Sequence, residues 1–221
     1  MNDLLPTATA VIELHDRLLA RSDWPRTADA VPQGEGSGWH WIQANHLFNS
    51  RLWAEEDLAR RTQVADADIA ANKRAIDGFN QARNDATERV DELLLVALGL
   101  VDPASARTDA PVSRVPSGAR LNSETAGSIV DRLSIMALKV NAMRQQTRRT
   151  DADAQHIAAS QGKLARLLEQ RTDLGACLDG LLADAQAGRA YFKVYRQFKM
   201  YNDPRFNPAL VAEQRDAQQR R

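Results

Sequence analysis

Apolar side chains recur along most of this chain at the three- and four-residue spacing of an α-helix, and no useful stretch alternates like a strand. Prolines are absent from residues 33–102 and 117–203, so both stretches can continue as helix. The pattern predicts helices at residues 7–21, 39–62, 65–98, 123–149, 151–187 and 189–200. We therefore expect an all-α, single-domain bundle of about five to six helices, with long central helices and no sheet.

Glycine and proline mark the expected breaks between these helices. Loops are predicted at residues 22–38 and 101–120, and Gly99 and Gly188 are expected to end the helices before them. Asn and Asp beside Pro204 and Pro208 should turn the chain after the last helix. This division gives a helical bundle domain at residues 1–210 and a polar C-terminal tail, a frayed helix at most, at residues 211–221.

Composition narrows the class of protein. The chain has 221 residues, with 29 basic and 29 acidic side chains, and zero net charge argues against a nucleic-acid partner. The longest apolar run, residues 93–101, is too short to span a bilayer, and the N-terminus does not resemble a secretory signal. A single cysteine, Cys177, rules out an intramolecular disulfide and is expected in the core beside Leu174 and Leu178. We expect a cytoplasmic protein without a membrane span.

Polar residues gather beside the apolar seams of three helices. On residues 65–98 one flank of the seam is entirely polar, and Arg83 lies on the seam itself, where an apolar side chain is expected. The asparagines in these stripes are poor helix formers, which favours a partly buried polar network over a solvated face. The helix at 123–149 adds cations on its own flank. The candidate ligand-binding residues are Asn45, Asn49, Glu56, Lys73, Asp77, Asn80, Arg83, Asn84, Glu88, Asp91, Ser128, Arg132 and Lys139.

A guanidinium on an apolar seam needs a partner. Glu56 lies beside the seam of the preceding helix, whereas Asp131 projects away from the apolar line of the helix at 123–149. The sequence therefore predicts an ion pair between Arg83 and Glu56, completed by Asn45 or Asn49.

Motifs for several common chemistries are missing. No histidine pair has zincin or di-iron spacing, and His40 and His46 are expected at the helix surface or core edge. Ser123 or Thr125 is expected to cap the helix at 123–149, an interpretation we favour over anion binding there.

One enzyme pattern stays open. MazG-like nucleotide pyrophosphatases hold magnesium with acidic pairs on two helices, and Glu88 with Asp91, joined by Glu56, would supply part of such a set.

Aromatic and basic residues are interleaved at residues 191–201. Such a segment can bind nucleic acid or a sugar. We favour a helix that packs Tyr191, Tyr195 and Phe198 into the bundle and leaves its basic residues in water.

Several separated segments resemble, in matching order, those of the bacterial domain-of-unknown-function family 4254. They are NHLFNSRLWAEEDLAR at 45–60, KRAIDGFNQARND at 73–85, ERVD at 88–91, LNSETAGSIVDRLSI at 121–135 and YRQFKMYNDP at 195–204. Members of this family tend to lie beside glycosyltransferases in gene clusters for cell-surface polysaccharide. The resemblance carries no established activity, and it leaves the cofactor unknown.

That context implies an accessory or ligand-binding factor for glycan biosynthesis, with a glycosyltransferase or a nucleotide sugar as partner. Two alternatives remain: a metal-dependent all-α nucleotide hydrolase using Glu56, Glu88 and Asp91, and a scaffold whose polar network only fixes helix register. The sequence does not choose between them, and it does not define the oligomeric state.

Overall fold

The computed structural model describes residues 5–26, 37–197 and 205–219, and it is helical over most of that length. Its elements are α1 (Ala8–Leu19), α2 (Gly38–Leu58), α3 (Asp66–Ala97), β1 (Arg120–Leu121), α4 (Ala126–Gln146), α5 (Ala154–Gln186), β2 (Ala190–Tyr191) and α6 (Pro208–Gln219). The prediction of an all-α fold is confirmed. The expected absence of a sheet differs from the structure by one pair of two-residue strands.

Most of the helices begin where a polar side chain can accept a hydrogen bond from the free N–H groups of the first turn. Thr7, Ser37, Thr125 and Asp153 cap α1, α2, α4 and α5 in this way. Thr125 was one of the two caps expected for α4. Gly99 and Gly188 follow the ends of α3 and α5 with positive φ, the backbone conformation that favours glycine.

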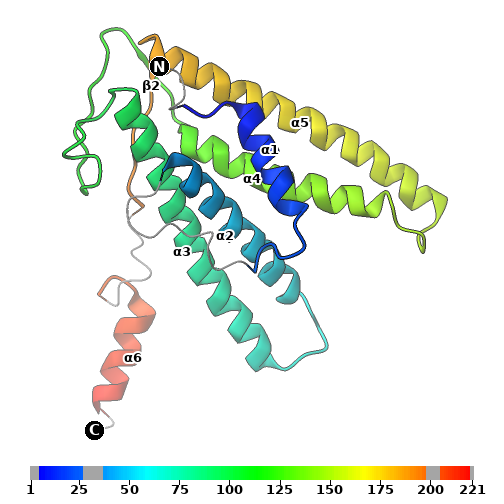
Figure 1. Cartoon of the computed structure of the whole chain (residues 1–221). Helices are drawn as coiled ribbons and strands as arrows, with labels where there is room; N and C mark the ends of the chain where they lie inside the picture. Colours follow the sequence, from blue (N-terminus) through cyan, green and yellow to red (C-terminus); the bar gives the residue numbers. More distant parts are fainter. Residues whose placement is uncertain (1–4, 27–36, 198–204, 220–221) are drawn as a thin grey trace.

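Two helical hairpins and one crossing helix form the bundle (Figure 1). Helices α2 and α3 pair along their length, as do α4 and α5, and α4 also packs against α1, α2 and α3. The main core fills the space between these helices, around Leu47, Val90, Leu133 and Leu178. Helix α4 is therefore covered on several sides, a point that decides which of its polar residues are buried.

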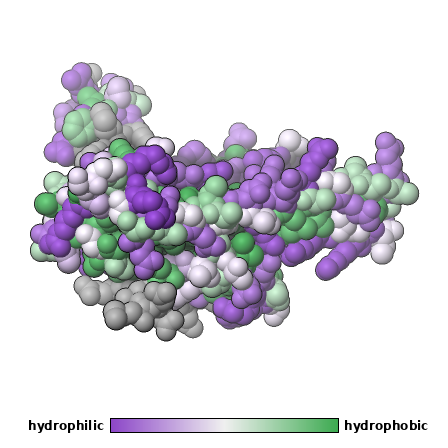
Figure 2. Space-filling model, turned by 90° about the horizontal axis from the view of Figure 1, so that it is seen from above, coloured by the Kyte–Doolittle hydropathy of each residue, from purple (hydrophilic) through white to green (hydrophobic). Residues whose placement is uncertain are grey.

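Hydrophilic and apolar side chains are mixed over the surface. On the face seen in Figure 2, hydrophilic residues enclose smaller apolar areas, and the molecule narrows toward the right, where the α4–α5 hairpin ends. Among the helices that the structure describes, none is both long and apolar enough to cross a bilayer.

The prediction of a helix at residues 189–200 is wrong over the part of this segment that the structure describes. Residues 190–191 form β2, which pairs in parallel with β1, and residues 192–197 continue without helix. Burial alternates along this segment: Ala190, Phe192 and Val194 are buried, whereas Tyr195 is 57% exposed. The apolar period is thus two, the period of a strand, and the seam of Tyr191 and Tyr195 does not exist. Phe198 lies outside the described residues.

Two further expectations need correction or completion. Cys177 is exposed, because α5 buries only a narrow stripe that includes Leu174, Leu178 and Leu181. Residues 208–219 form α6, which stands apart from the bundle in Figure 1. Of the loop at 22–38 and the turn at 201–208, residues 27–36 and 201–204 lie outside the described residues.

His46 is also deeper than expected, since it is fully buried at the centre of an aromatic stack. Its ring lies 4.3 Å from that of His15 and 5.4 Å from that of Trp24. Its Nδ1 is 2.8 Å from the Ser134 hydroxyl, and Trp24 donates to Ser50. Burial lowers the pKa of His46 to about 3 and that of His15 well below its ordinary value, so both rings are neutral core residues. His40, in contrast, belongs to the exposed capping box of α2.

The extended segment after α5 makes a prediction about stability. Replacing Phe192, which is 1% exposed, by Ala should lower the free energy of unfolding, by about 3–5 kcal/mol as for other buried aromatics. Tyr195→Ala is the matched control and should change it by less than about 0.5 kcal/mol. Urea unfolding followed by circular dichroism measures both. A larger loss for Tyr195→Ala than for Phe192→Ala would restore the helical assignment.

Candidate functional site

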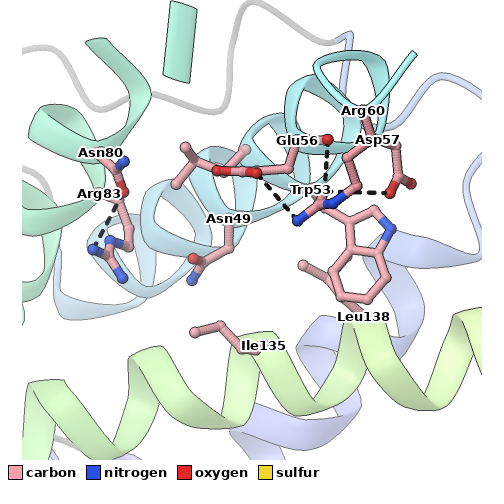
Figure 3. A pocket seen from close by; sticks show the side chains of 10 residues that line it. Asn49, Trp53, Glu56, Asp57, Arg60, Asn80, Arg83, Ile135 and Leu138 are labelled. Atoms are coloured by element: carbon pink, nitrogen blue, oxygen red, sulfur yellow. Dashed lines mark hydrogen bonds and ion pairs between the residues drawn. The ribbon is translucent and has the colours of Figure 1, made fainter. Parts of the chain in front are cut away.

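A cavity of about 450 Å³ opens between α2, α3 and α4 (Figure 3). Helix α2 contributes Asn49, Trp53 and Glu56 to its wall, α3 contributes Asn80 and Arg83, and α4 closes it with the apolar side chains of Ile135 and Leu138. Asp57 and Arg60 complete the polar rim, where Arg60 pairs with Glu56 at 3.3 Å. Four of the predicted site residues, Asn49, Glu56, Asn80 and Arg83, therefore share one cavity.

The carboxylate of Asp131 lies beside this cavity and joins the three helices. Its Oδ1 accepts hydrogen bonds from the amide nitrogens of Asn45 and Asn49, each at 2.8 Å. Its Oδ2 lies 3.2 Å from Nη1 of Arg83. Asn45 also donates to the hydroxyl of Thr87 on α3. A largely buried carboxylate is thus satisfied by donors from α2 and α3, as burial of a charge requires.

The predicted pairing of Arg83 with Glu56 is wrong. Asp131 holds Arg83, while Glu56 is bound by Arg60 on its own helix and its side chain is 48% exposed. Asp131 was set aside because it departs from the main apolar line of α4. That helix is covered on several sides, however, so a second stripe of Asp131, Ser134 and Leu138 also faces inward, with Ser134 and Leu138 buried.

Arg83 lines the cavity, and its guanidinium keeps unused hydrogen-bonding capacity. Among the described residues its side chain reaches, besides Asp131, only the side-chain oxygen of Asn80, at 3.4 Å. Its Nε is buried and has no hydrogen-bond partner within the part of the chain that the structure describes. A guanidinium has five N–H donors, so this one is only partly satisfied by the protein.

Two of the predicted cations line a second cavity of about 630 Å³ between α4 and α5, which shares Ile135 with the first. Arg132 contacts Glu124 at 2.6 Å, and Lys139 lies one helical turn away from Ile135 along α4. The basic residues expected to face the amides and acids are therefore adjacent to the first cavity, across Ile135. Ser128 does not join them, because its hydroxyl accepts from Thr125 at the start of α4.

The remaining candidates have structural partners elsewhere. Lys73 and Asp77 pair with each other on the exposed face of α3. Asn84 donates to Gln197, and Glu88 accepts from Arg196 at 2.9 Å. Arg196 also reaches Glu92 at 2.5 Å and the carbonyl oxygens of Ala106 and Thr108. This half of the polar flank of α3 therefore anchors the segment that follows β2.

Asp91 sits where α4 begins. Its Oδ1 accepts from the backbone N–H of Gly127 at 2.6 Å. The two helices are so close here that a Cβ on Gly127 would lie 2.6 Å from the carbonyl oxygen of Thr87. Burial raises the pKa of Asp91 to about 7, and the negative charges of Glu88 and Glu92 add to this, against hydrogen bonds from Thr125 and Gly127 that lower it.

The magnesium set considered for a MazG-like hydrolase is not assembled. Glu56, Glu88 and Asp91 are bound to Arg60, Arg196 and Gly127 respectively. No group of three or more His, Cys, Asp or Glu side chains suited to a metal ion occurs in the described ranges. The alternative that rested on these three carboxylates has no ligand cluster.

The fold and its polar cavity define an all-α bundle protein with a candidate binding site between α2, α3 and α4. Residues 39–194 match the model of a family described as a protein of unknown function, DUF4254, and the chain belongs to this family. The resemblance noted from the separated motifs is thus confirmed. No curated protein and no solved structure matches the chain.

Several residues of the site were missed by sequence reasoning. They are Trp53, Asp57, Arg60, Asp131, Ile135 and Leu138. The spacing of Asp131, Ser134 and Leu138, three and then four residues, was a readable signal of a second inward face. Trp53 carried no such signal, because it lies at the edge of the α2 seam.

Removing the carboxylate of Asp131 should destabilise the protein much more than removing that of Glu56. Asp131→Ala should lower the free energy of unfolding by about 3 kcal/mol, because Arg83 and the two asparagines lose their shared acceptor. Glu56→Ala should cost about 0.5 kcal/mol or less, as for an exposed ion pair. Chemical denaturation of the single variants Asp131→Ala, Glu56→Ala and Arg83→Ala, and of the double variant Arg83→Ala/Asp131→Ala, tests this. The double variant should lose less than the sum of the single losses, and additive losses would contradict the pairing.

The raised pKa of Asp91 makes stability depend on pH. The folded protein holds this proton up to a pH of about 7, whereas the ordinary value is 3.8. The stabilising contribution of Asp91 is therefore full below pH 4 and is lost as the pH rises through 7. Between pH 4 and pH 8, the free energy of unfolding of the wild type should fall by up to about 4 kcal/mol relative to that of Asp91→Asn.

Measuring this difference between variants cancels the opposite trend of His15 and His46, whose lowered pKa values make stability fall below pH 6.5. Asp85→Asn, on the exposed face of α3, is the control and should give a difference that varies little with pH. A difference between wild type and Asp91→Asn that stays constant from pH 4 to 8 would contradict the prediction.

Proposed function

We propose that this protein is a cytoplasmic ligand-binding or accessory factor of cell-surface glycan biosynthesis, and that its ligand is a nucleotide sugar. The observation that carries the proposal is the cavity between α2, α3 and α4, which is lined by Arg83, whose guanidinium is only partly satisfied, beside Asn49, Asn80 and Glu56. The genomic context implied by the family resemblance supports the glycan assignment.

The lining of this cavity suits a ring that carries hydroxyl groups. The amide of Asn80 can donate to and accept from neighbouring hydroxyls, and the carboxylate of Glu56 can accept from them. The guanidinium of Arg83 adds further donors. Trp53 is 37% exposed and offers an apolar face at the cavity wall. A volume of about 450 Å³ lies within the range of small-molecule sites.

The adjacent cavity suits the charged part of such a ligand. Arg132 and Lys139 line it, and it meets the first cavity at Ile135. Guanidinium and ammonium groups are common phosphate binders. In this proposal the sugar lies among Asn49, Asn80 and Arg83, and the diphosphate lies toward Lys139.

Calorimetric titration with UDP-, GDP- and dTDP-linked hexoses tests the proposal. At least one should bind with a dissociation constant below about 1 mM. Asn80→Ala and Lys139→Gln should each weaken that binding by about tenfold, because one contacts the sugar and the other the phosphates. Asp77→Asn is the control, since Asp77 points outward on the same helix and pairs with Lys73.

Failure of every nucleotide sugar to bind at millimolar concentration would contradict the proposal. Equal binding by wild type and by both cavity variants would contradict the assigned location. A stable complex with a glycosyltransferase in the absence of any such binding would favour the scaffold alternative.

A further inference from the structure

A third cavity, of about 420 Å³, lies between α2, α4 and α5 on the far side of Trp53. Its wall is part apolar, from Trp53, Met143 and Leu167, and part basic, from Lys139, Lys163 and Arg166. It shares Trp53 with the first cavity and Lys139 with the second. Of the site residues predicted from the sequence, Lys139 alone lines it.

The charge of this cavity is not compensated. Lys139, Lys163 and Arg166 form no ion pair and no side-chain hydrogen bond with any residue that the structure describes. No carboxylate of the described residues lines the cavity, whereas Glu56 and Asp57 line the first and Glu124 and Asp173 line the second. The other three arginines of α4 and α5 do have acidic partners: Arg132 pairs with Glu124, and Arg144 and Arg171 pair with Asp16.

Three cations without ion-pair partners among the described residues lie around apolar side chains in this cavity. They favour a ligand that has both an anionic group and an apolar part. The positive potential attracts an anion, and a concave, low-dielectric wall strengthens that attraction. The apolar side chains gain free energy when an apolar body displaces water from them. An anion alone leaves Trp53, Met143 and Leu167 wet, and an apolar molecule alone leaves the cations without a partner.

We propose that this cavity binds a single soluble amphiphile with a phosphate-type head group and an apolar chain. The head group lies among Lys139, Lys163 and Arg166, and the chain lies on Trp53, Met143 and Leu167. The occupant is a monomer and not a bilayer surface, because the apolar residues line a hollow between helices. This inference does not rest on the proposed nucleotide-sugar site.

Calorimetric titration of the whole 221-residue chain with decyl phosphate, below the critical micelle concentration of that compound, tests the inference. The double variant Lys163→Gln/Arg166→Gln should bind about tenfold more weakly than the wild type, because two of three head-group contacts are removed. Arg17→Gln/Arg74→Gln is the matched control: it removes the same charge from exposed residues of α1 and α3 and should leave the affinity unchanged. Circular dichroism verifies that all variants fold.

Two further probes separate the head group from the chain. Inorganic phosphate and decyl glucoside should each bind at least about tenfold more weakly than decyl phosphate. Equal affinity of decyl phosphate and decyl glucoside, or equal losses in the two double variants, would overturn the inference. Sedimentation with anionic phospholipid vesicles that depends on Lys163 and Arg166, without binding of decyl phosphate, would overturn it in favour of a membrane surface.

Discussion

The side chain of Asp131 is the constraint around which this bundle is arranged. A carboxylate that is largely removed from water must have donors close by, and here they come from two other helices: Asn45 and Asn49 on α2, and Arg83 on α3. Hydrogen bonds have a narrow range of length, so this cluster fixes how α2, α3 and α4 meet far more strictly than apolar packing alone. Asn49 and Arg83 also line the first cavity, which makes the binding geometry a consequence of the same contacts.

The sequence was informative about helices and less so about which faces they bury. Spacing and capping residues predicted five of the helices to within a few residues. From the sequence, one buried stripe was expected on each helix. This expectation placed the apolar seam of α3, but it missed the second buried stripe of α4, which packs against four other helices. The partner of Arg83 was missed for that reason. The choice between Glu56 and Asp131 depends on how α4 is rotated against α2 and α3, which no local pattern records.

The extended segment after α5 was hidden by a different cause. Tyr191 and Tyr195 have helical spacing, but Phe192 and Val194 are the buried residues, and five residues of alternation are too few to outweigh a long helical context. The strand pairs with residues 120–121, about seventy positions away, so its partner cannot be seen locally. Because the segment is extended, Arg196 crosses to Glu88 and Glu92 on α3.

The polar flank of α3 is therefore one sequence feature with two physical outcomes. Toward the end of the helix its carboxylates are occupied: Glu88 holds Arg196, and Asp91 holds the first turn of α4. Toward the middle, Asn80 and Arg83 face a cavity and retain donors that the described protein groups do not use. Helical spacing is the same in both halves. What separates a structural polar residue from a candidate binding residue is whether the fold satisfies it, and that is decided by which segment crosses the helix at its level.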